Sequence, residues 1–262
     1  NKTLVPDSFK KAGIGFALDL ILDKNGKIKK YKLRYKELYQ EDWKPDTEVK
    51  AIIKKYSKKT EEMMQQAIGY VDSELSRSKD SEAILGNLIA DVLQKKTNSD
   101  IALVGGLQSD LKQGQITIGD IYNISPIVDR LEVSGFNIAI PELSGEKIKN
   151  ILERSVGWAL ENSKYGILQV SGLKMIYDPK RTRGNRVIDV IINGEKLDPN
   201  KIYKVAVNGY LASGGDGYYD IISAEQRYDT GLMDFDVLVE YIKAHSPINA
   251  PPLEGRIVRV EE

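Results

Sequence analysis

The residues whose types could do chemistry gather in one glycine-rich loop, NGYLASGGDGYYD, at residues 208–220. An acid, Asp216, follows the glycines Gly214 and Gly215, and Tyr210 precedes them. Glycine permits a positive φ and a close approach of the backbone to a neighbour. From these residues alone, the loop fits a tight turn from a strand into a helix, with Asp216 as the cap.

Composition limits the chemistry open to this chain of 262 residues. It has no cysteine, which excludes disulfides, thiolate metal sites and cysteine nucleophiles. It has one histidine, His245, whereas two-metal phosphoesterase sites and most catalytic zinc sites draw on several. His245 lies in the proline-rich stretch KAHSPINAPP, which favours a solvated helix end over a catalytic role. Acids and bases balance at 38 each, so net charge gives no support to a nucleic-acid or anionic-membrane surface.

From about residue 80, helical and strand patterns are mixed. The helical patterns lie at 81–97, at 144–160 after a Ser144 cap, and at 235–245. Strand patterns lie at 100–106, 166–178, 186–194, 201–212 and 254–260, with a hairpin turn at NGEK. Because helices and strands do not alternate strictly, the expected fold is α/β with mixed sheets and helices on their faces.

The N-terminal part has a different pattern. Residues 16–35 predict a β-hairpin in which Asn25 and Gly26 take the two positive-φ positions of a tight turn. A helix is expected to begin near Asp46 and to continue for about six turns to Val71, because apolar residues recur at spacings of three, four or seven. Such a helix is typical of a connector between two blocks.

Six stretches in this order resemble the C-terminal domain of the 5'-nucleotidase family, which includes UDP-sugar hydrolases and ecto-5'-nucleotidases. Together they cover about residues 80 to 262. They are LGNLIADVL (85–93), GQITIGDIYNISP (114–126), LSGEKIKNILERSV (143–156), LQVSGLKMIYDPKRTRGNRV (168–187), YKVAVNGYLASGGDGY (203–218) and EGRIVRV (254–260).

The resemblance implies a layered α/β/β/α domain at residues 80–262, with a connector helix at 45–79 before it. Residues 1–44 resemble the end of the metallophosphoesterase domain that comes first in the family. That domain uses two divalent metals, and its Asp, His and Asn ligands have no counterpart here. The chain is therefore expected to hold no metal or other cofactor of its own.

In the family, the glycine loop approaches a bound nucleoside. Its aspartate, matched here by Asp216, accepts hydrogen bonds from the ribose hydroxyls, and a carboxylate offers only acceptors to a diol. An aromatic ring upstream, matched by Tyr210, stacks on the base. The resemblance thus implies substrate binding by Asp216, Tyr210, Gly214 and Gly215.

Three positions depart from the family pattern. Gln108 stands where an arginine helps to hold the substrate, and glutamine lacks the charged fork that clamps phosphate. Asp129 stands near the place of a base-reading asparagine, although the adjacent Arg130 could partly compensate. Ile167 replaces the phenylalanine that forms the second wall around the base. Losing two such contacts would weaken binding by roughly a hundredfold or more.

Two functions stay open. The first is the nucleotide- or nucleoside-recognition domain of a phosphoester hydrolase, inactive alone and working with a metallophosphoesterase domain or chain. The alternative is a degenerate binding or structural module. The resemblance also implies a secreted, periplasmic or cell-surface location. A self-sufficient hydrolase is disfavoured, because the chain has no second histidine and no Gly-x-Ser-x-Gly motif.

Overall fold

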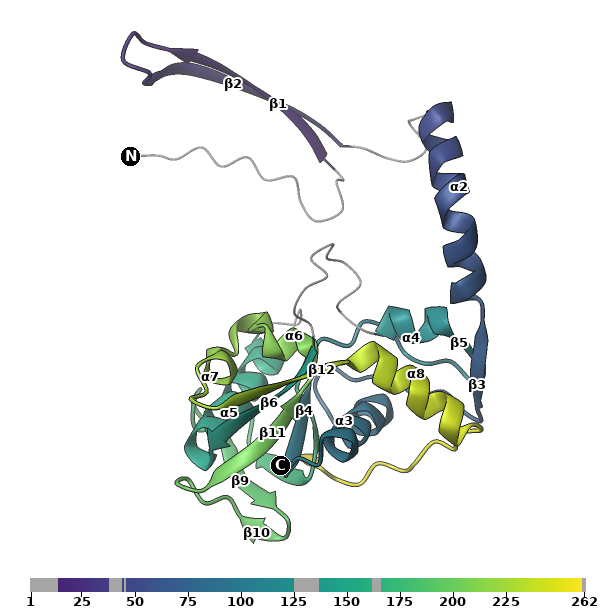
Figure 1. Cartoon of the computed structure of the whole chain (residues 1–262). Coiled ribbons are helices and arrows are strands. Elements are labelled where there is room, and N and C mark those ends of the chain that lie inside the picture. The colour runs from purple at the N-terminus through teal and green to yellow at the C-terminus, as the bar shows by residue number, and fades with distance from the viewer. Residues whose placement is uncertain (1–13, 38–43, 45, 125–136, 162–165, 261–262) are drawn as a thin grey trace. The chain divides into compact units, whose positions relative to one another are not determined.

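The computed structural model describes residues 14–37, 44, 46–124, 137–161 and 166–260 (Figure 1). By its internal contacts the chain divides into two compact units, Asn1–Lys59 and Thr60–Glu262. This division does not test the domain boundaries expected after residues 44 and 79, which stay predictions. Every described residue of the two hydrophobic cores belongs to the second unit.

The hairpin of the first unit is confirmed. Its antiparallel strands are β1 (Ile14–Leu22) and β2 (Ile28–Glu37). The turn differs from the expected one, since only Gly26 has a positive φ, of 76°. The Asp23 carboxylate shapes the turn by accepting hydrogen bonds from the amides of Asn25 and Lys27, at 2.8 and 2.9 Å.

The connector helix begins where the sequence indicates and ends earlier. The Asp46 carboxylate caps α2 (Thr47–Met64) by accepting the amides of Glu48 and Val49, at 2.9 and 3.0 Å. The expected continuation of the helix to Val71 is wrong. Residues Ala67–Val71 form a strand, β3.

Tertiary pairing explains why β3 is a strand. It pairs antiparallel with β5 (Gly114–Thr117), which satisfies its backbone groups. Ile68 and Val71 are buried in one of the two cores. A side chain on Gly69 would meet Ile242, so this strand lies against another element at close range. These contacts outweigh a helical periodicity, which is a weak signal by itself.

Two mixed sheets form the frame of the second unit. The first has the order β12-β6-β11-β4-β7, and β11 and β4 run parallel. Its strands are β4 (Ile101–Val104), β6 (Asn137–Ser144), β7 (Gln169–Ser171), β11 (Ile202–Val207) and β12 (Arg227–Met233). The second has the order β10-β9-β8-β13. Its strands are β8 (Leu173–Tyr177), β9 (Val187–Ile192), β10 (Glu195–Lys196) and β13 (Ile257–Arg259).

Glycines separate strands at two positions, Gly172 and Gly194. The expected single strand at 166–178 divides at Gly172, whose φ is 73°, and β7 and β8 join different sheets. The NGEK turn is confirmed, since Asn193 and Gly194 both have positive φ and β9 pairs with β10 there. Its expected partner, the strand at 201–212, instead joins the five-stranded sheet as β11.

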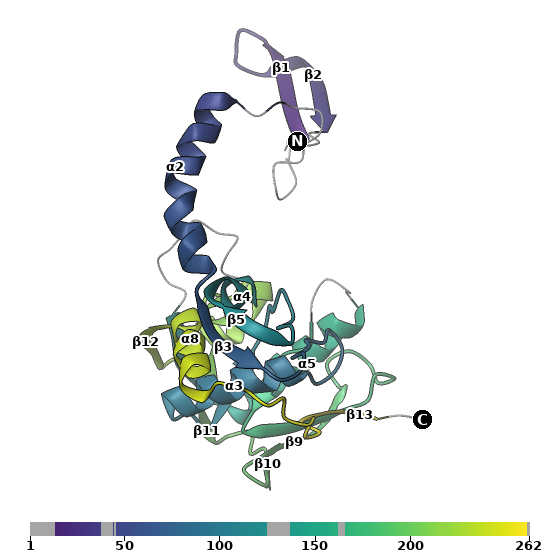
Figure 2. The same cartoon turned by 90° about the vertical axis from the view of Figure 1, so that its right-hand side faces the viewer.

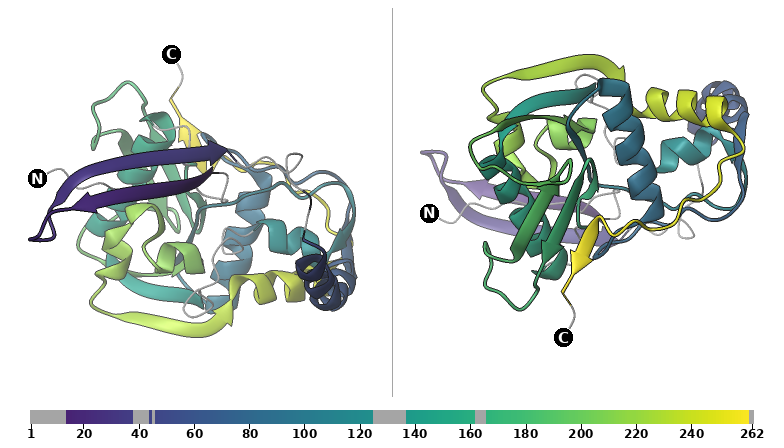
Figure 3. Two further views of the ribbon diagram at one scale, coloured as in Figure 1. Left: turned by 90° about the horizontal axis from the view of Figure 1, so that it is seen from above. Right: turned by 90° about the horizontal axis from the view of Figure 1, so that it is seen from below.

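Helices cover both faces of the five-stranded sheet. The helices α3 (Ile84–Thr97), α4 (Ile118–Ile124) and α8 (Asp234–His245) enclose one core, and α5 (Gly145–Glu161) with the four-stranded sheet encloses the other. Figure 2 shows α8 beside β3 and α4, and Figure 3 shows α3 beside α8. In β4, Ile101 and Leu103 enter one core while Ala102 and Val104 enter the other. The α/β class with mixed sheets is therefore confirmed.

Candidate functional site

The glycine loop begins where two parallel strands end side by side. β4 leads into Gly105 and β11 leads into Asn208, and the carboxyl ends of neighbouring parallel strands meet at one sheet edge. Asn208 is 1% exposed, and its Nδ2 donates to the Gly105 carbonyl at 3.1 Å. This bond ties the two glycine segments together. Sequence reasoning passed over Asn208, which it placed inside the strand at 201–212.

After Asn208 the backbone makes three short turns. These are α6 (Gly209–Ala212), a 3-10 turn η3 (Gly215–Gly217) and α7 (Tyr219–Ile222), and Figure 1 shows α6 and α7 close together. Gly214 has φ 80° and Asp216 has φ 54°. The expected turn from strand to helix is thus present. Among the hydrogen bonds of the described residues, none has the Asp216 side chain capping a helix.

Tyr210 and Asp216 are in direct contact. The Tyr210 hydroxyl donates to Asp216 Oδ1 at 2.6 Å, and both side chains are half-buried. A Cβ atom on Gly215 would lie 2.6 Å from the Tyr210 ring, so the ring rests on this glycine. Likewise, a Cβ on Gly214 would collide with Ile222. Three of the predicted residues, Tyr210, Gly215 and Asp216, therefore form one packed unit.

A cation lies beside this loop. Arg154 on α5 donates from Nη2 to the Asp216 carbonyl at 3.4 Å. Its guanidinium lies 5.1, 5.9 and 6.0 Å from the ring centres of Trp158, Tyr218 and Tyr219. Burial raises the pKa of Tyr218, which keeps that hydroxyl protonated. Arg154 was not among the predicted site residues, because only the fold brings α5 to the loop.

The remaining predicted residues have other surroundings. Gln108 is exposed, and its amide donates to the Gly106 carbonyl at 2.8 Å. Ile167 is 3% exposed and packs in the core that includes α5. Asp129, with Arg130 beside it, lies outside the described residues. A role in substrate binding stays a prediction for all three.

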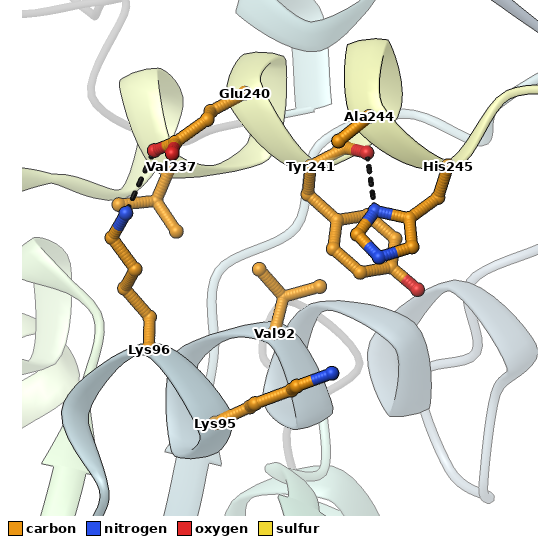
Figure 4. Close-up of a pocket in the computed structure, with 8 residues that line it drawn as sticks. All are labelled: Val92, Lys95, Lys96, Val237, Glu240, Tyr241, Ala244 and His245. Atoms are coloured by element: carbon orange, nitrogen blue, oxygen red, sulfur yellow. Dashed lines mark hydrogen bonds and ion pairs between the residues drawn. The ribbon is translucent and has the colours of Figure 1, made fainter.

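A separate hollow lies between α3 and α8, with a volume of about 330 Å³ (Figure 4). Val92 and Val237 give it apolar walls, and Lys96 pairs with Glu240 at 2.7 Å. His245 stacks on Tyr241 with ring centres 4.1 Å apart. None of the predicted binding residues lines this hollow, and the side chain of His245 is exposed at the end of α8.

The described side chains do not fit a metal centre. Throughout the part of the chain that the structure describes, no three His, Asp or Glu side chains converge as metal ligands. The acid of the loop is hydrogen-bonded to a tyrosine hydroxyl instead.

Comparison with known proteins gives the family. A family model for the 5'-nucleotidase C-terminal domain matches residues 60–223. The fold and the glycine loop define a domain of this type, and the chain belongs to the 5'-nucleotidase C-terminal domain family.

Individual relatives are longer than this chain. The trifunctional nucleotide phosphoesterase protein YfkN of Bacillus subtilis is 28% identical over 93% of this chain and 17% of its own length. A 5'-nucleotidase-related protein of Glossina morsitans morsitans is 30% identical over 98% of the chain and 49% of its own length. The crystal structure of a 5'-nucleotidase precursor from Thermus thermophilus superposes with a TM-score of 0.69 at 28% identity, over 96% of this chain and 50% of that one. The chain thus spans half or less of the length of these relatives.

Proposed function

We propose that the second unit recognises a nucleoside or nucleotide through its glycine loop. The observation that carries the proposal is the hydrogen bond of 2.6 Å from the Tyr210 hydroxyl to Asp216 Oδ1, which orients a half-buried carboxylate. Within the described residues, no hydrogen bond reaches Asp216 Oδ2, so this oxygen is available to accept from a ribose hydroxyl. The positive φ of Asp216 turns its backbone away from the regular helical path.

The domain then serves as the recognition part of a phosphoester hydrolase. Water activation by two metals requires ligands that its described residues do not bring together. A separate metallophosphoesterase domain or chain would supply them, in line with relatives named nucleotide phosphoesterase and 5'-nucleotidase-related protein. Holding the nucleoside at a fixed place beside those metals would contribute orientation to the reaction.

One observation favours a second candidate, a module that no longer binds nucleotides. Gln108 is exposed and bonded to its own loop, and Ile167 is buried in the core. Neither side chain offers the cation or the second aromatic wall that the family resemblance implies.

Calorimetric titration separates the two candidates. With adenosine, AMP and UDP-glucose as ligands, we expect a Kd of about 1 mM or tighter for at least one of them, which corresponds to about 4 kcal/mol. Asp216→Ala should abolish the heat of ligand binding. Asp220→Ala, which removes a neighbouring acid from the same segment, should leave that heat unchanged. Absence of heat at millimolar ligand would favour the module instead.

We also propose an exported or cell-surface location, which rests on the family resemblance. The described helices include none that is both long and apolar enough to cross a membrane. The coding sequence before Asn1 tests this proposal and the proposed catalytic partner together. A metallophosphoesterase domain behind an export signal is expected there. Steady phosphate release from nucleoside monophosphates by this chain alone, with divalent ions supplied, would contradict the proposal that a separate domain or chain carries out the hydrolysis.

A further inference from the structure

The side chain of Arg154 lies against Trp158 of its own helix and against the glycine loop, including the rings of Tyr218 and Tyr219. Its guanidinium is within 6.0 Å of the ring centres of Trp158, Tyr218 and Tyr219. A planar guanidinium stacks on aromatic faces in a way that an ammonium cannot reproduce. The rings therefore restrict where this cation can point.

The loop is shaped to receive this cation. A Cβ atom on Gly217 would lie 2.6 Å from Arg154 Nη2, so a side chain there would displace the guanidinium from its present position. Gly217 also has a positive φ of 71°, which glycine adopts without strain. Hence the path of the loop and the position of Arg154 depend on each other.

Arg154 touches the backbone of the acid itself. Its Nη2 donates to the carbonyl of Asp216, a residue in the left-handed region that non-glycine residues rarely occupy. Its Nε is buried, and no hydrogen-bond partner for it exists among the residues that the structure describes. One end of the guanidinium thus supports the loop, while its charge lies close to the acid.

We propose that Arg154 is the positioning residue of the nucleoside site. It fixes the backbone of Asp216 so that the carboxylate faces the ribose diol, and it brings a positive charge to the loop, where Gln108 brings none. This role rests on the proposed function of the loop. It assigns to α5 a part in ligand recognition beyond its part in the core.

Three variants test the proposal. Arg154→Met removes the charge and the hydrogen bond but keeps an apolar chain among the rings, and Arg154→Lys keeps the charge without the planar stacking. Lys149→Gln is the matched control, because it removes one positive charge from an exposed position of the same helix. Each protein is titrated with adenosine and with 2',3'-dideoxyadenosine, which lacks the diol.

The ratio of the two affinities is the decisive measurement. We expect the unaltered chain to bind adenosine more tightly than 2',3'-dideoxyadenosine. Arg154→Met should lower this ratio of affinities by roughly tenfold. Arg154→Lys should restore part of it, and Lys149→Gln should not change it. If Arg154 had a purely structural role, its loss would lower the affinity for both ligands by the same factor. An unchanged ratio of affinities in Arg154→Met therefore overturns the proposal.

A second measurement does not depend on ligand binding. The amide signals of Asp216 and Gly217, followed by NMR without ligand, should shift in Arg154→Met and remain in place in Lys149→Gln. If the unaltered chain binds no nucleoside, the proposed function fails, and these signals alone then decide whether Arg154 positions the loop. Unchanged signals in Arg154→Met overturn its positioning role.

Discussion

At the scale of single residues, the loop is organised by a tyrosine and an acid that hold each other. The Tyr210 hydroxyl bonds to Asp216, the Tyr210 ring rests on Gly215, and the backbone of Asp216 has a positive φ of 54°. A hydrogen bond to a charged acceptor contributes about 1.5–3 kcal/mol, which offsets the cost of order 1–3 kcal/mol of that backbone conformation. The Asp216 carboxylate is therefore held in one orientation within the loop.

We predict that Tyr210→Phe loosens the loop while the fold remains intact. The ring still covers Gly215, but the carboxylate loses its donor. The Gly217 amide, which donates to the Gly214 carbonyl at 2.9 Å, should exchange with solvent roughly tenfold faster. Tyr219→Phe is the control, because the ring of Tyr219 is 69% exposed and its hydroxyl makes no hydrogen bond to the described residues. Unchanged exchange in Tyr210→Phe would show that the hydroxyl bond does not hold the loop.

At the scale of elements, polar groups pin the ends of strands and helices. The buried Glu82 carboxylate, just before α3, accepts the amides of Glu254 and Arg256, at 2.9 and 2.7 Å, at the approach to β13. Arg256 in turn forms a forked pair with Asp91 on α3, at 2.6 and 2.8 Å. These bonds attach the last strand to a helix that lies more than 150 positions earlier in the sequence. A substitution at Glu82 would therefore affect two elements together.

The start of α8 carries an acid whose ionisation opposes folding. Asp234 is 4% exposed, and burial raises its pKa to about 6 from an ordinary value of 3.8. Burial favours the protonated form of Asp234 in the folded state. Protonated Asp234 therefore makes its full contribution to the free energy of unfolding below pH 3.8. That contribution, about 1–3 kcal/mol, is lost as the pH rises through about 6.

We predict that Asp234→Asn removes this part of the pH dependence. The amide oxygen can still accept the Phe235 amide, which Asp234 Oδ1 now accepts at 3.0 Å. Chemical unfolding at pH 4, 6 and 7.5 should show the variant gaining stability relative to the unaltered chain as the pH rises. Glu225→Gln, which removes an exposed carboxylate away from Asp234, should keep the original slope. Parallel curves for Asp234→Asn and the unaltered chain would contradict a buried, protonated Asp234.

At the scale of the whole molecule, the stability of the second unit resides in its own residues. The described core residues all lie between Ile68 and Ile257, and α2 buries none of its side chains. We therefore predict that removing residues 1–46 changes the thermal midpoint of the second unit by no more than about 2 °C. Scanning calorimetry of the full and shortened chains measures this shift, and a fall of more than about 5 °C would show that the first unit supports the second.

The sequence by itself determined the features that depend on residues close together along the chain. The alternation of Phe16, Leu18 and Leu20 indicates a strand of the hairpin, Asp46 caps α2, and Asn193-Gly194 makes a turn, because each depends on neighbours along the chain. The family follows from six stretches in order, and the glycine loop with Tyr210 and Asp216 stands out by its residue types.

Tertiary structure alone decided the rest. Residues Ala67–Val71 form a strand rather than a helix because β5 lies beside them. The exposed β12, whose sequence does not alternate between apolar and polar residues, is a strand because β6 pairs with it. Arg154 reaches Asp216, and Asn208 reaches Gly105, across 62 and 103 positions of sequence. Such contacts depend on how sheets and helices pack, and no spacing along a chain encodes them.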